Sequence, residues 1–501
     1  MRIVVCAGLV GIVGCLLATC NVAEAETSVP EKPNILFAFA DDWGYPHAGI
    51  HGDPTVQTPT FDRVAREGVL FRHAYISSPS CTPSRGAILA GKHFWQLGAG
   101  ANLWSQFPED VVTYAELLAE QGGYFVGHTR KGWAPGRIGD RPHNPAGPRF
   151  ANFARFLEAR PEGQPFCFWF GSQDPHRGVR GDGAALRRAK GIDPDEVVVP
   201  PMLPNAAAVR EDIAEYYAQV QRFDREVGEL LKLLEERGEL DRTIVVISSD
   251  HGWSFPRGKT NLYDVGTQVP LAVRWPAGID RAGRTVTDFV SLCDLAPTFL
   301  EAGGVEIPAA MTARSFLPLL LSDAEGRIDA SRDHVLTGRE RHTPAQERGN
   351  PGGYPMRAIR TDQYLYIRNY LPERWPEGTP DREHAYIENA WLGDADNGQT
   401  KFYLWANRDC PQVRPLYDLA YAKRPAEELY DVQEDPHQFH NLAADPDYAD
   451  VLRELSQRLS RYLRQTGDPR QLGTDPEMDQ VEYFGGIPRW PGQEVIDRFR
   501  D

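Results

Sequence analysis

The residues best placed to do chemistry begin with Cys81, which precedes Arg85 by four positions in the segment "SCTPSRGAILAG" (residues 80–91). Thr82 is suited to cap a helix and Pro83 to open it, so we expect Cys81 at a helix N-terminus. Free N–H groups and the helix dipole favour a bound anion there. The same setting would lower the pKa of a thiol, and a cysteine nucleophile with a histidine base is one hypothesis.

Aspartates elsewhere in the chain indicate a different chemistry. Asp41, Asp42 and Asp250 offer the oxygen ligands that a hard divalent cation prefers. A thiolate is a poor ligand for such a cation. The residue types therefore leave three options for Cys81: a structural thiol, a nucleophile as it stands, or the precursor of another group.

Four apolar runs predict the strands that must position these residues, because each run ends in a polar cluster. The runs are "NILFAFADDWG", "GYFVGHTRKGW", "PFCFWFGSQDPHR" and "TIVVISSDHGW". Helical patterns lie between them, at residues 58–68, 113–123 and 207–240. This alternation predicts an α/β fold with a large, mainly parallel sheet sandwiched between helices. Ligands bind at the carboxyl ends of such strands, so we expect one shared site, although any apolar run must become polar where it reaches solvent.

The C-terminal part predicts a smaller α+β subdomain. "RAIRTDQYLYIRNY" and "EELYDVQEDP" are typical of antiparallel strands, and residues 447–467 form an amphipathic helical pattern with leucines on one face. "QERGNPGG", at residues 346–353, predicts a linker. We therefore expect a catalytic domain over residues 26–350 and a C-terminal subdomain over residues 351–501, with a small antiparallel sheet, a helix and a tail.

The first 25 residues predict a secretory signal. An apolar run behind Arg2 is followed by small residues at Ala23 and Ala25, the layout of a signal-peptide cleavage site. "LATC" ending at Cys20 is a weaker match to a lipoprotein signal, and a retained membrane anchor lacks a stop-transfer pattern. We expect export to the periplasm or the extracellular space, with no membrane span in the mature chain.

Charge and cysteine content exclude other classes. The formal net charge of −16 argues against a nucleic-acid partner, so an anionic substrate would need positive charge concentrated at one site. Beyond the leader the chain has four cysteines, Cys81, Cys167, Cys293 and Cys410. They are too few and too scattered for a disulfide framework.

The pattern C-x-P-x-R in "CTPSR" resembles the maturation signature of type I sulfatases. "NILFAFADDWG", "DPHR", "SSDHG" and "EELYDVQEDPHQFHNLA" resemble further landmarks of that family, in the same order along the chain. The resemblance implies an alkaline-phosphatase-like fold and oxidation of Cys81 to Cα-formylglycine by a formylglycine-generating enzyme. One hydroxyl of the hydrated aldehyde would attack sulfur and displace the leaving group, and loss of the proton from the second would then restore the aldehyde and expel sulfate.

The resemblance also implies roles for individual residues. The implied Ca²⁺ ligands are Asp41, Asp42, Asp250, His251 and the modified Cys81. Arg85 would hold the formylglycine, while Lys131 and Lys259 would bind the sulfate oxygens. His176 would donate a proton to the leaving group. Imidazole is not a favoured Ca²⁺ ligand, so His251 either coordinates the metal or only contacts the modified residue.

One position departs from the family pattern. Where sulfatases usually have lysine, any residue, histidine, this chain has Lys131, Gly132 and Trp133. Either His128 reaches the site from the preceding turn, or that role is absent. A solvent-facing position at the end of a strand is the other interpretation of His128.

Several stretches, including "SFPRGKTNLYDVGTQVPL" and "GYPMRAIRTDQYLYIRN", are similar to the sulfamidase branch of the family, which acts on N-sulfoglucosamine of heparan sulfate. Sugar contacts are then expected from Arg339, Glu340, His342 and Arg357, unless this charge cluster is only an exposed loop. An O-sulfatase acting on a sulfated polysaccharide is one alternative. A phosphonate or phosphodiester hydrolase is another, as is a carbohydrate-binding protein without catalysis if Cys81 is never modified.

Overall fold

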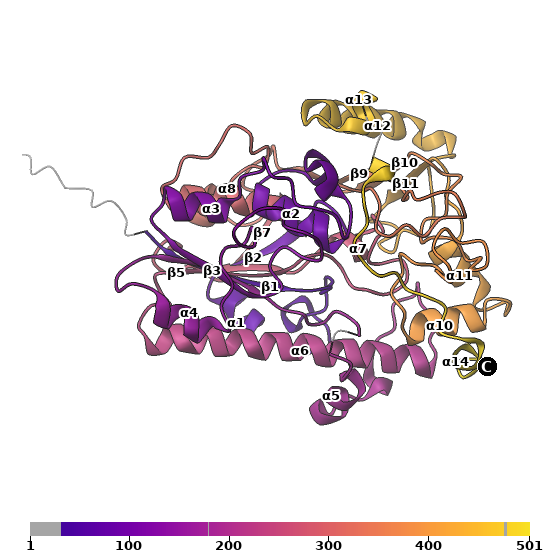
Figure 1. The fold of residues 1–501 in the computed structure, drawn as a ribbon, viewed down its shortest axis with the longest axis horizontal. Coiled ribbons are helices and arrows are strands. Elements are labelled where there is room, and N and C mark those ends of the chain that lie inside the picture. The colour runs from indigo at the N-terminus through magenta and orange to yellow at the C-terminus, as the bar shows by residue number, and fades with distance from the viewer. Residues whose placement is uncertain (1–31, 179, 475–477, 501) are drawn as a thin grey trace, which may run out of the picture. The chain divides into compact units, whose positions relative to one another are not determined.

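The centre of the computed structural model is a seven-stranded sheet with the order β3-β4-β1-β5-β6-β2-β7 (Figure 1). Its strands are β1 (Asn34–Ala40), β2 (Val69–Tyr75), β3 (Phe125–Arg130), β4 (Phe166–Gly171), β5 (Thr243–Ser249), β6 (Leu271–Arg274) and β7 (Arg284–Ser291). Only β6 runs antiparallel to its neighbours, β5 and β2. The other pairs are parallel, which confirms the predicted, mainly parallel sheet.

The structure describes residues 32–178, 180–474 and 478–500. The predicted signal sequence over residues 1–25, with the alternative lipoprotein site at Cys20, lies outside them. Within the described residues, no helix is both long enough and apolar enough to span a bilayer. All four cysteines beyond the leader are free thiols.

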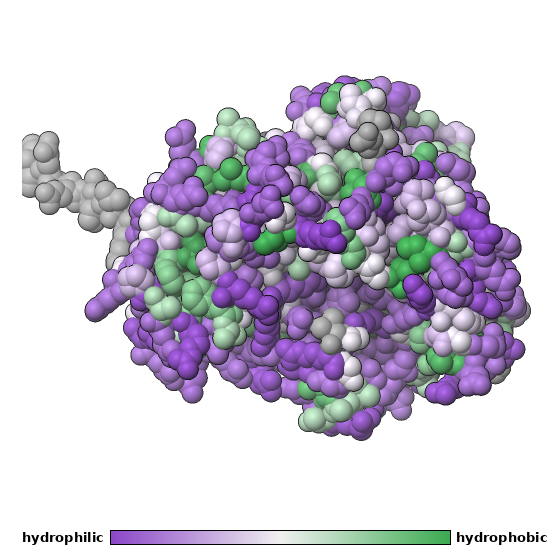
Figure 2. Space-filling model, in the orientation of Figure 1, coloured by the Kyte–Doolittle hydropathy of each residue, from purple (hydrophilic) through white to green (hydrophobic). Residues whose placement is uncertain are grey.

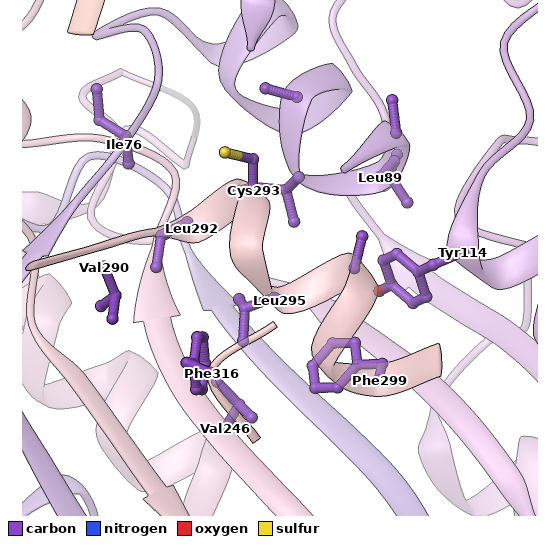
Figure 3. Close-up of a cluster of buried hydrophobic side chains, with 14 of the residues drawn as sticks. Ile76, Leu89, Tyr114, Val246, Val290, Leu292, Cys293, Leu295, Phe299 and Phe316 are labelled. Carbon is purple, nitrogen blue, oxygen red and sulfur yellow. The ribbon is translucent and has the colours of Figure 1, made fainter. Parts of the chain in front are cut away.

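Helices cover both faces of the large sheet because the side chains of its central strands are apolar on both sides. On β1, Ile35, Phe37 and Phe39 join one buried cluster, and Leu36, Ala38 and Ala40 join the other. The first cluster packs against α2 (Cys81–Ala90), α3 (Tyr114–Glu120) and α8 (Leu295–Ala302). Figure 3 shows part of it, with Cys293 among apolar side chains. Figure 1 shows the second layer on the opposite face: α1 (Pro59–Arg66), α4 (Phe153–Ala159) and α6 (Ala207–Glu236).

A second sheet has four antiparallel strands in the order β11-β10-β9-β8. They are β8 (His334–Arg339), β9 (Met356–Thr361), β10 (Tyr364–Asn369) and β11 (Glu427–Asp431). Leu455, Leu459 and Leu463 of α12 (Ala449–Gln465) are buried in the cluster that includes one face of this sheet. The sheet and helix thus match the prediction, but the sheet begins with β8, ahead of the predicted linker. Residues 33–501 form one compact unit.

Short helices complete the chain around these two sheets: α5 (Gly183–Lys190), α7 (Asp264–Thr267), α9 (Leu317–Leu321), α10 (Gln399–Ala406), α11 (Arg414–Tyr421), α13 (Pro469–Leu472) and α14 (Gln493–Asp497). Figure 2 shows a mostly hydrophilic surface on the visible face, with small and separate hydrophobic patches. This surface agrees with the charge composition of the chain.

Candidate active site

Four neighbouring strands deliver the predicted residues to one edge of the large sheet. Asp41 and Asp42 follow β1, Asp250 and His251 follow β5, and Lys131 follows β3. His176 comes shortly after β4, which lies between β3 and β1. Because β3, β4, β1 and β5 are parallel neighbours, their carboxyl ends meet, and the expected shared site is present in the structure.

Cys81 lies at the first residue of α2, with Ser80 as the N-cap residue. Thr82, expected as the cap, is instead inside the helix and donates its hydroxyl hydrogen bond to Pro135 O. The Cys81 Sγ atom is 3.4 Å from His251 Nε2 and 3.8 Å from Asp41 Oδ1. Burial raises the pKa of the Cys81 thiol, although Lys131 and Lys259 oppose this shift. The expectation of a lowered thiol pKa is therefore wrong, because burial outweighs the helix terminus and the nearby cations.

Arg85 binds the acids of the site from within α2. Its Nε donates to Asp250 Oδ2 at 2.9 Å, and its Nη2 donates to Asp41 Oδ1 at 3.3 Å. Nη1 donates to the backbone carbonyls of Lys131 and Gly132. Burial would raise the pKa of Asp250, but neighbouring positive charge, including that of Arg85, holds it well below its usual range. Arg85 thus holds both carboxylates in place beside Cys81.

The acids and His251 have the arrangement of a cation site. Ligand atoms of Asp41, Cys81 and Asp250 lie within 4.8 Å of one another, as do those of Asp42, Cys81 and His251. The His251 Nδ1 atom donates to Gly252 O at 3.0 Å, which leaves Nε2 with its lone pair. That atom lies 3.0 Å from Asp42 Oδ1, a buried oxygen that accepts no hydrogen bond. A cation between these lone pairs would satisfy both atoms, so the residues fit a divalent metal.

Lysines complete the charge balance of the site. Lys131 Nζ donates to Asp41 Oδ1 at 2.6 Å. Lys259 Nζ donates to Asp42 Oδ2 at 3.1 Å and to Asp396 Oδ2 at 3.0 Å. Burial would lower the pKa of Lys259, but Asp396 and Asp42 raise it well above its usual value. Both lysines are therefore positively charged.

His176 and Asp396 meet at Lys259. The His176 Nδ1 atom donates to Arg177 O at 2.8 Å, and its Nε2 faces Lys259 Nζ at 3.3 Å. The sequence did not predict Asp396, because its segment "WLGDADNGQT" contains no motif and has the polar composition of a loop. Only the fold brings this loop to the strand ends.

Part of this group lines a cavity of about 460 Å³, a size within the range of ligand sites, and is called its floor here: Asp41, Cys81, Lys131, His176, Lys259 and Asp396. Its charged and polar lining includes Asp41, Cys81, Arg130, Lys131, Gln173, His176, Lys259, His342, Thr343 and Asp396. Its apolar lining is Leu103, Trp104, Ala134, Pro135, Gly486 and Pro488. An anionic group bound here would meet two lysines in an otherwise acidic protein.

Of the expected sugar contacts, the structure brings only His342 to the cavity. Its Nδ1 lies 2.8 Å from Ser80 Oγ, and burial lowers the pKa of its ring well below the usual value. Arg339 is buried and donates to Thr260 O and Pro376 O.

Glu340 and Arg357 are also buried and do not line the cavity. Arg357 is bound between Glu340 and Asp468, each at 2.5 Å, and Arg470 binds the second oxygen of Glu340 at 2.6 Å. The alternation of β8 and β9 turns these side chains inward, where each charge needs a buried partner. Arg339, Glu340 and Arg357 were expected to contact the sugar. The structure instead buries them away from the cavity, where they stabilise the fold.

His128 does not replace the missing histidine. Its ring is buried, and Nδ1 donates to Gly147 O at 2.8 Å. His128 is absent from the lining of the cavity, and so is Trp133, whose ring packs edge-on against Phe107. The solvent-facing alternative for His128 is also wrong, since residues 147–150 cover this end of β3.

The large sheet, its helix layers and the site at the strand ends have an alkaline-phosphatase-like architecture. A family model described as Sulfatase matches residues 33–135 and 149–305, and the chain belongs to the sulfatase family. Hydrolases of this family act on sulfate esters or sulfamides. A second model, N-sulphoglucosamine sulphohydrolase, C-terminal, matches residues 249–376.

Individual relatives agree with the family models. The chain is 29% identical to human N-sulphoglucosamine sulphohydrolase, covering 89% of this chain and 93% of that protein. It is 28% identical to an ulvan-active sulfatase of Formosa agariphila, covering 89% and 83% of the two chains. The solved structure of BT4656 in complex with its substrate D-glucosamine-2-N,6-O-disulfate has the same fold, with a TM-score of 0.60 and 21% identity over 90% of this chain and all of that one.

Proposed function

We propose that this sulfatase releases sulfate from sulfated carbohydrates, with N-sulfoglucosamine of heparan or heparin as its substrate. One observation carries the proposal: Cys81 of the C-x-P-x-R signature lines a cavity together with Lys131 and Lys259, and its Sγ lies among the ligand atoms of Asp41, Asp42 and Asp250. The C-terminal family model and the human relative, both named for N-sulphoglucosamine, favour the N-sulfated sugar.

Catalysis requires conversion of Cys81 to Cα-formylglycine by a formylglycine-generating enzyme, since the buried neutral thiol is a poor nucleophile. A hydroxyl of the hydrated aldehyde then replaces the thiol as the attacking group. Ca²⁺ bound by Asp41, Asp42, Asp250 and His251 would lower the pKa of that hydroxyl and withdraw charge from the sulfuryl oxygens.

The surrounding residues hold the sulfuryl group and manage protons. Lys131 and Lys259 lie on the cavity floor and supply positive charge where negative charge develops on sulfate. Arg85 holds Asp41 and Asp250 in place. His176 faces the cavity with Nε2, the atom from which a proton would reach the leaving group.

The test is a panel of sulfated sugars assayed with modified enzyme. N-sulfoglucosamine should release sulfate with the highest kcat/KM, above glucosamine 6-O-sulfate and 2-O-sulfated disaccharides. Turnover of O-sulfated sugars alone would overturn the choice of substrate. Phosphonate and phosphate esters in the same panel test the phosphohydrolase alternative.

An O-sulfatase is the second candidate, because one relative is named an ulvan-active sulfatase and matches over a similar length. We also propose that the leader directs export, so that the enzyme meets its saccharide outside the cytoplasm. The mature N-terminus of the secreted protein, read by sequencing, tests this: cleavage after Ala25 is expected, and lipid attached at Cys20 would contradict it.

A further inference from the structure

The C-terminal strap, residues 483–490, runs along the active-site cavity and supplies part of its wall. Gly486 and Pro488 line the cavity. The strap lies beyond residues 249–376, where the C-terminal family model matches, so neither family model assigns it a role.

Hydrogen bonds hold the strap to two other segments of the chain, at Trp104 and at residues 389–397. At its start, Phe484 N donates to Trp104 O at 2.9 Å. At its end, Trp490 N donates to Asn389 O at 3.0 Å, and Asn397 Nδ2 donates to Arg489 O at 2.9 Å. These bonds hold the strap at both of its ends.

Trp104 is the aromatic residue of the cavity lining. Its backbone has a φ of 52°, a left-handed conformation that bulky residues rarely adopt and that persists where the surroundings impose it. The strap is part of those surroundings, because a Cβ atom on Gly485 would lie only 2.2 Å from the indole. Glycine at this position lets the strap backbone pack directly on the Trp104 ring.

The next residue of the strap, Gly486, serves a different purpose. A Cβ atom built there meets no atom within 4 Å, and its φ lies outside the left-handed region. Gly486 also lines the cavity, so the space around such a Cβ atom is open next to the cavity. The two glycines thus fix the indole and leave room beside it.

We propose that Trp104 and the strap form the subsite for the sugar ring, with the indole stacked on the pyranose and Gly486 leaving room for the ring's substituents. An indole offers a large, rigid apolar face that suits the C–H face of a pyranose, and few polar groups are then needed to orient the sugar. The subsite rests on the proposed function, since it assumes a sulfated sugar as the ligand.

Calorimetric binding to protein carrying Cys81→Ala tests the subsite, because the ligand is then not consumed. Trp104→Ala should weaken binding of N-sulfoglucosamine about five- to tenfold, while inorganic sulfate, which has no ring, binds within about twofold of the parent. Gly486→Leu should weaken sugar binding at least as much. Its matched control, Gly486→Ala, should change it less than about threefold, since the small side chain leaves most of the room.

Unchanged sugar affinity in both Trp104→Ala and Gly486→Leu would overturn the subsite. Gly486→Leu keeps the test valid if Trp104→Ala lowers the melting temperature, because the leucine enters open space. Binding of an O-sulfated sugar in place of N-sulfoglucosamine, with the same loss in both variants, would support the subsite and contradict the proposed substrate. Failure of every sulfated sugar to bind would overturn both.

Discussion

At the scale of single residues, each cation on the cavity floor is bound by a carboxylate. Lys131 contacts Asp41, and Lys259 contacts both Asp42 and Asp396. These contacts hold the ammonium groups at fixed positions before substrate arrives, so that little reorganisation is needed when charge develops on a sulfuryl group.

Lys259→Ala should therefore lower kcat about 10²- to 10³-fold, the usual loss when one preorganised group that stabilises charge is removed. Sulfate release under saturating substrate measures it. Lys232→Ala, an exposed lysine on α6, is the matched control and should retain the parent kcat. A near-normal kcat for Lys259→Ala would remove this residue from the sulfate site.

Metal removal should destabilise the protein, because the unfolded chain cannot assemble the aspartate ligands. At a Ca²⁺ concentration 100 times the dissociation constant, the bound ion contributes about 3 kcal/mol to the free energy of unfolding. A chelator should thus lower Tm, and Ca²⁺ should restore it. Asp42→Asn should abolish this response, whereas the exposed Asp241→Asn should keep it. Equal Tm values with and without chelator in the parent would contradict a metal at this site.

Asp41, Asp42, Lys131, His176, Asp250 and His251 could be predicted from the sequence, because each follows an apolar run that must end at the same sheet edge. Asp396 could not, since its loop has no periodicity and reaches Lys259 only through the fold. Arg357 is the opposite case: the sequence predicted a sugar contact, but the structure buries this side chain away from the cavity. Charges in a sequence predict exposure, and only the buried partners Glu340 and Asp468 explain why this guanidinium is inside.

At the scale of elements, Lys401 on α10 organises the loop that carries Asp396. Its Nζ lies within 3.1 Å of three backbone carbonyls, those of Trp391, Leu392 and Ala395. It also donates to Asn397 Oδ1 at 3.0 Å. One buried lysine therefore contacts four acceptors of residues 391–397.

Lys401→Met should leave these carbonyls buried without donors and lower the free energy of unfolding by about 3 kcal/mol. Because the same loop holds Asp396 against Lys259, kcat/KM should fall as well. Thermal melting and sulfate release measure the two effects. Lys423→Met removes an exposed lysine over the Trp375 ring and should change neither. A Lys401→Met protein that melts and turns over like the parent would contradict the role of this lysine.

Long elements were predictable and short ones were not. The apolar runs of β1, β4 and β5 and the helical spacing of α6 are long enough to define a period. β6 has only four residues, and β8, "HVLTGR", has two large apolar side chains. The strand conformation of such segments depends on pairing with neighbouring strands. The sequence alone therefore did not predict β8, which pairs with β9 in the structure.

At the scale of the whole molecule, each face of the large sheet is covered by one buried cluster, and the two clusters hold together the strand ends that carry the site. The second cluster also encloses imidazoles. Burial lowers the pKa of His47 to about 4 and that of His51 to about 4. Both rings are neutral in the folded protein near neutral pH, and protonation favours the unfolded chain.

Stability should therefore fall as pH drops from about 6.5, the pKa of an unfolded histidine, towards about 4, with each ring contributing up to about 3 kcal/mol. Chemical denaturation across this range measures the slope. His47→Phe keeps an aromatic ring beside Tyr216 and should flatten the dependence. His440→Phe, at an exposed position, should retain the parent slope. An identical slope in His47→Phe would contradict a neutral buried His47.

The most direct test of the whole account is the mass of the peptide that contains Cys81, taken from protein made in a host with a formylglycine-generating enzyme. We predict the mass of an aldehyde in place of the thiol, and sulfate release in proportion to the fraction converted. Full sulfatase activity in protein whose Cys81 is entirely an unmodified thiol would contradict the account.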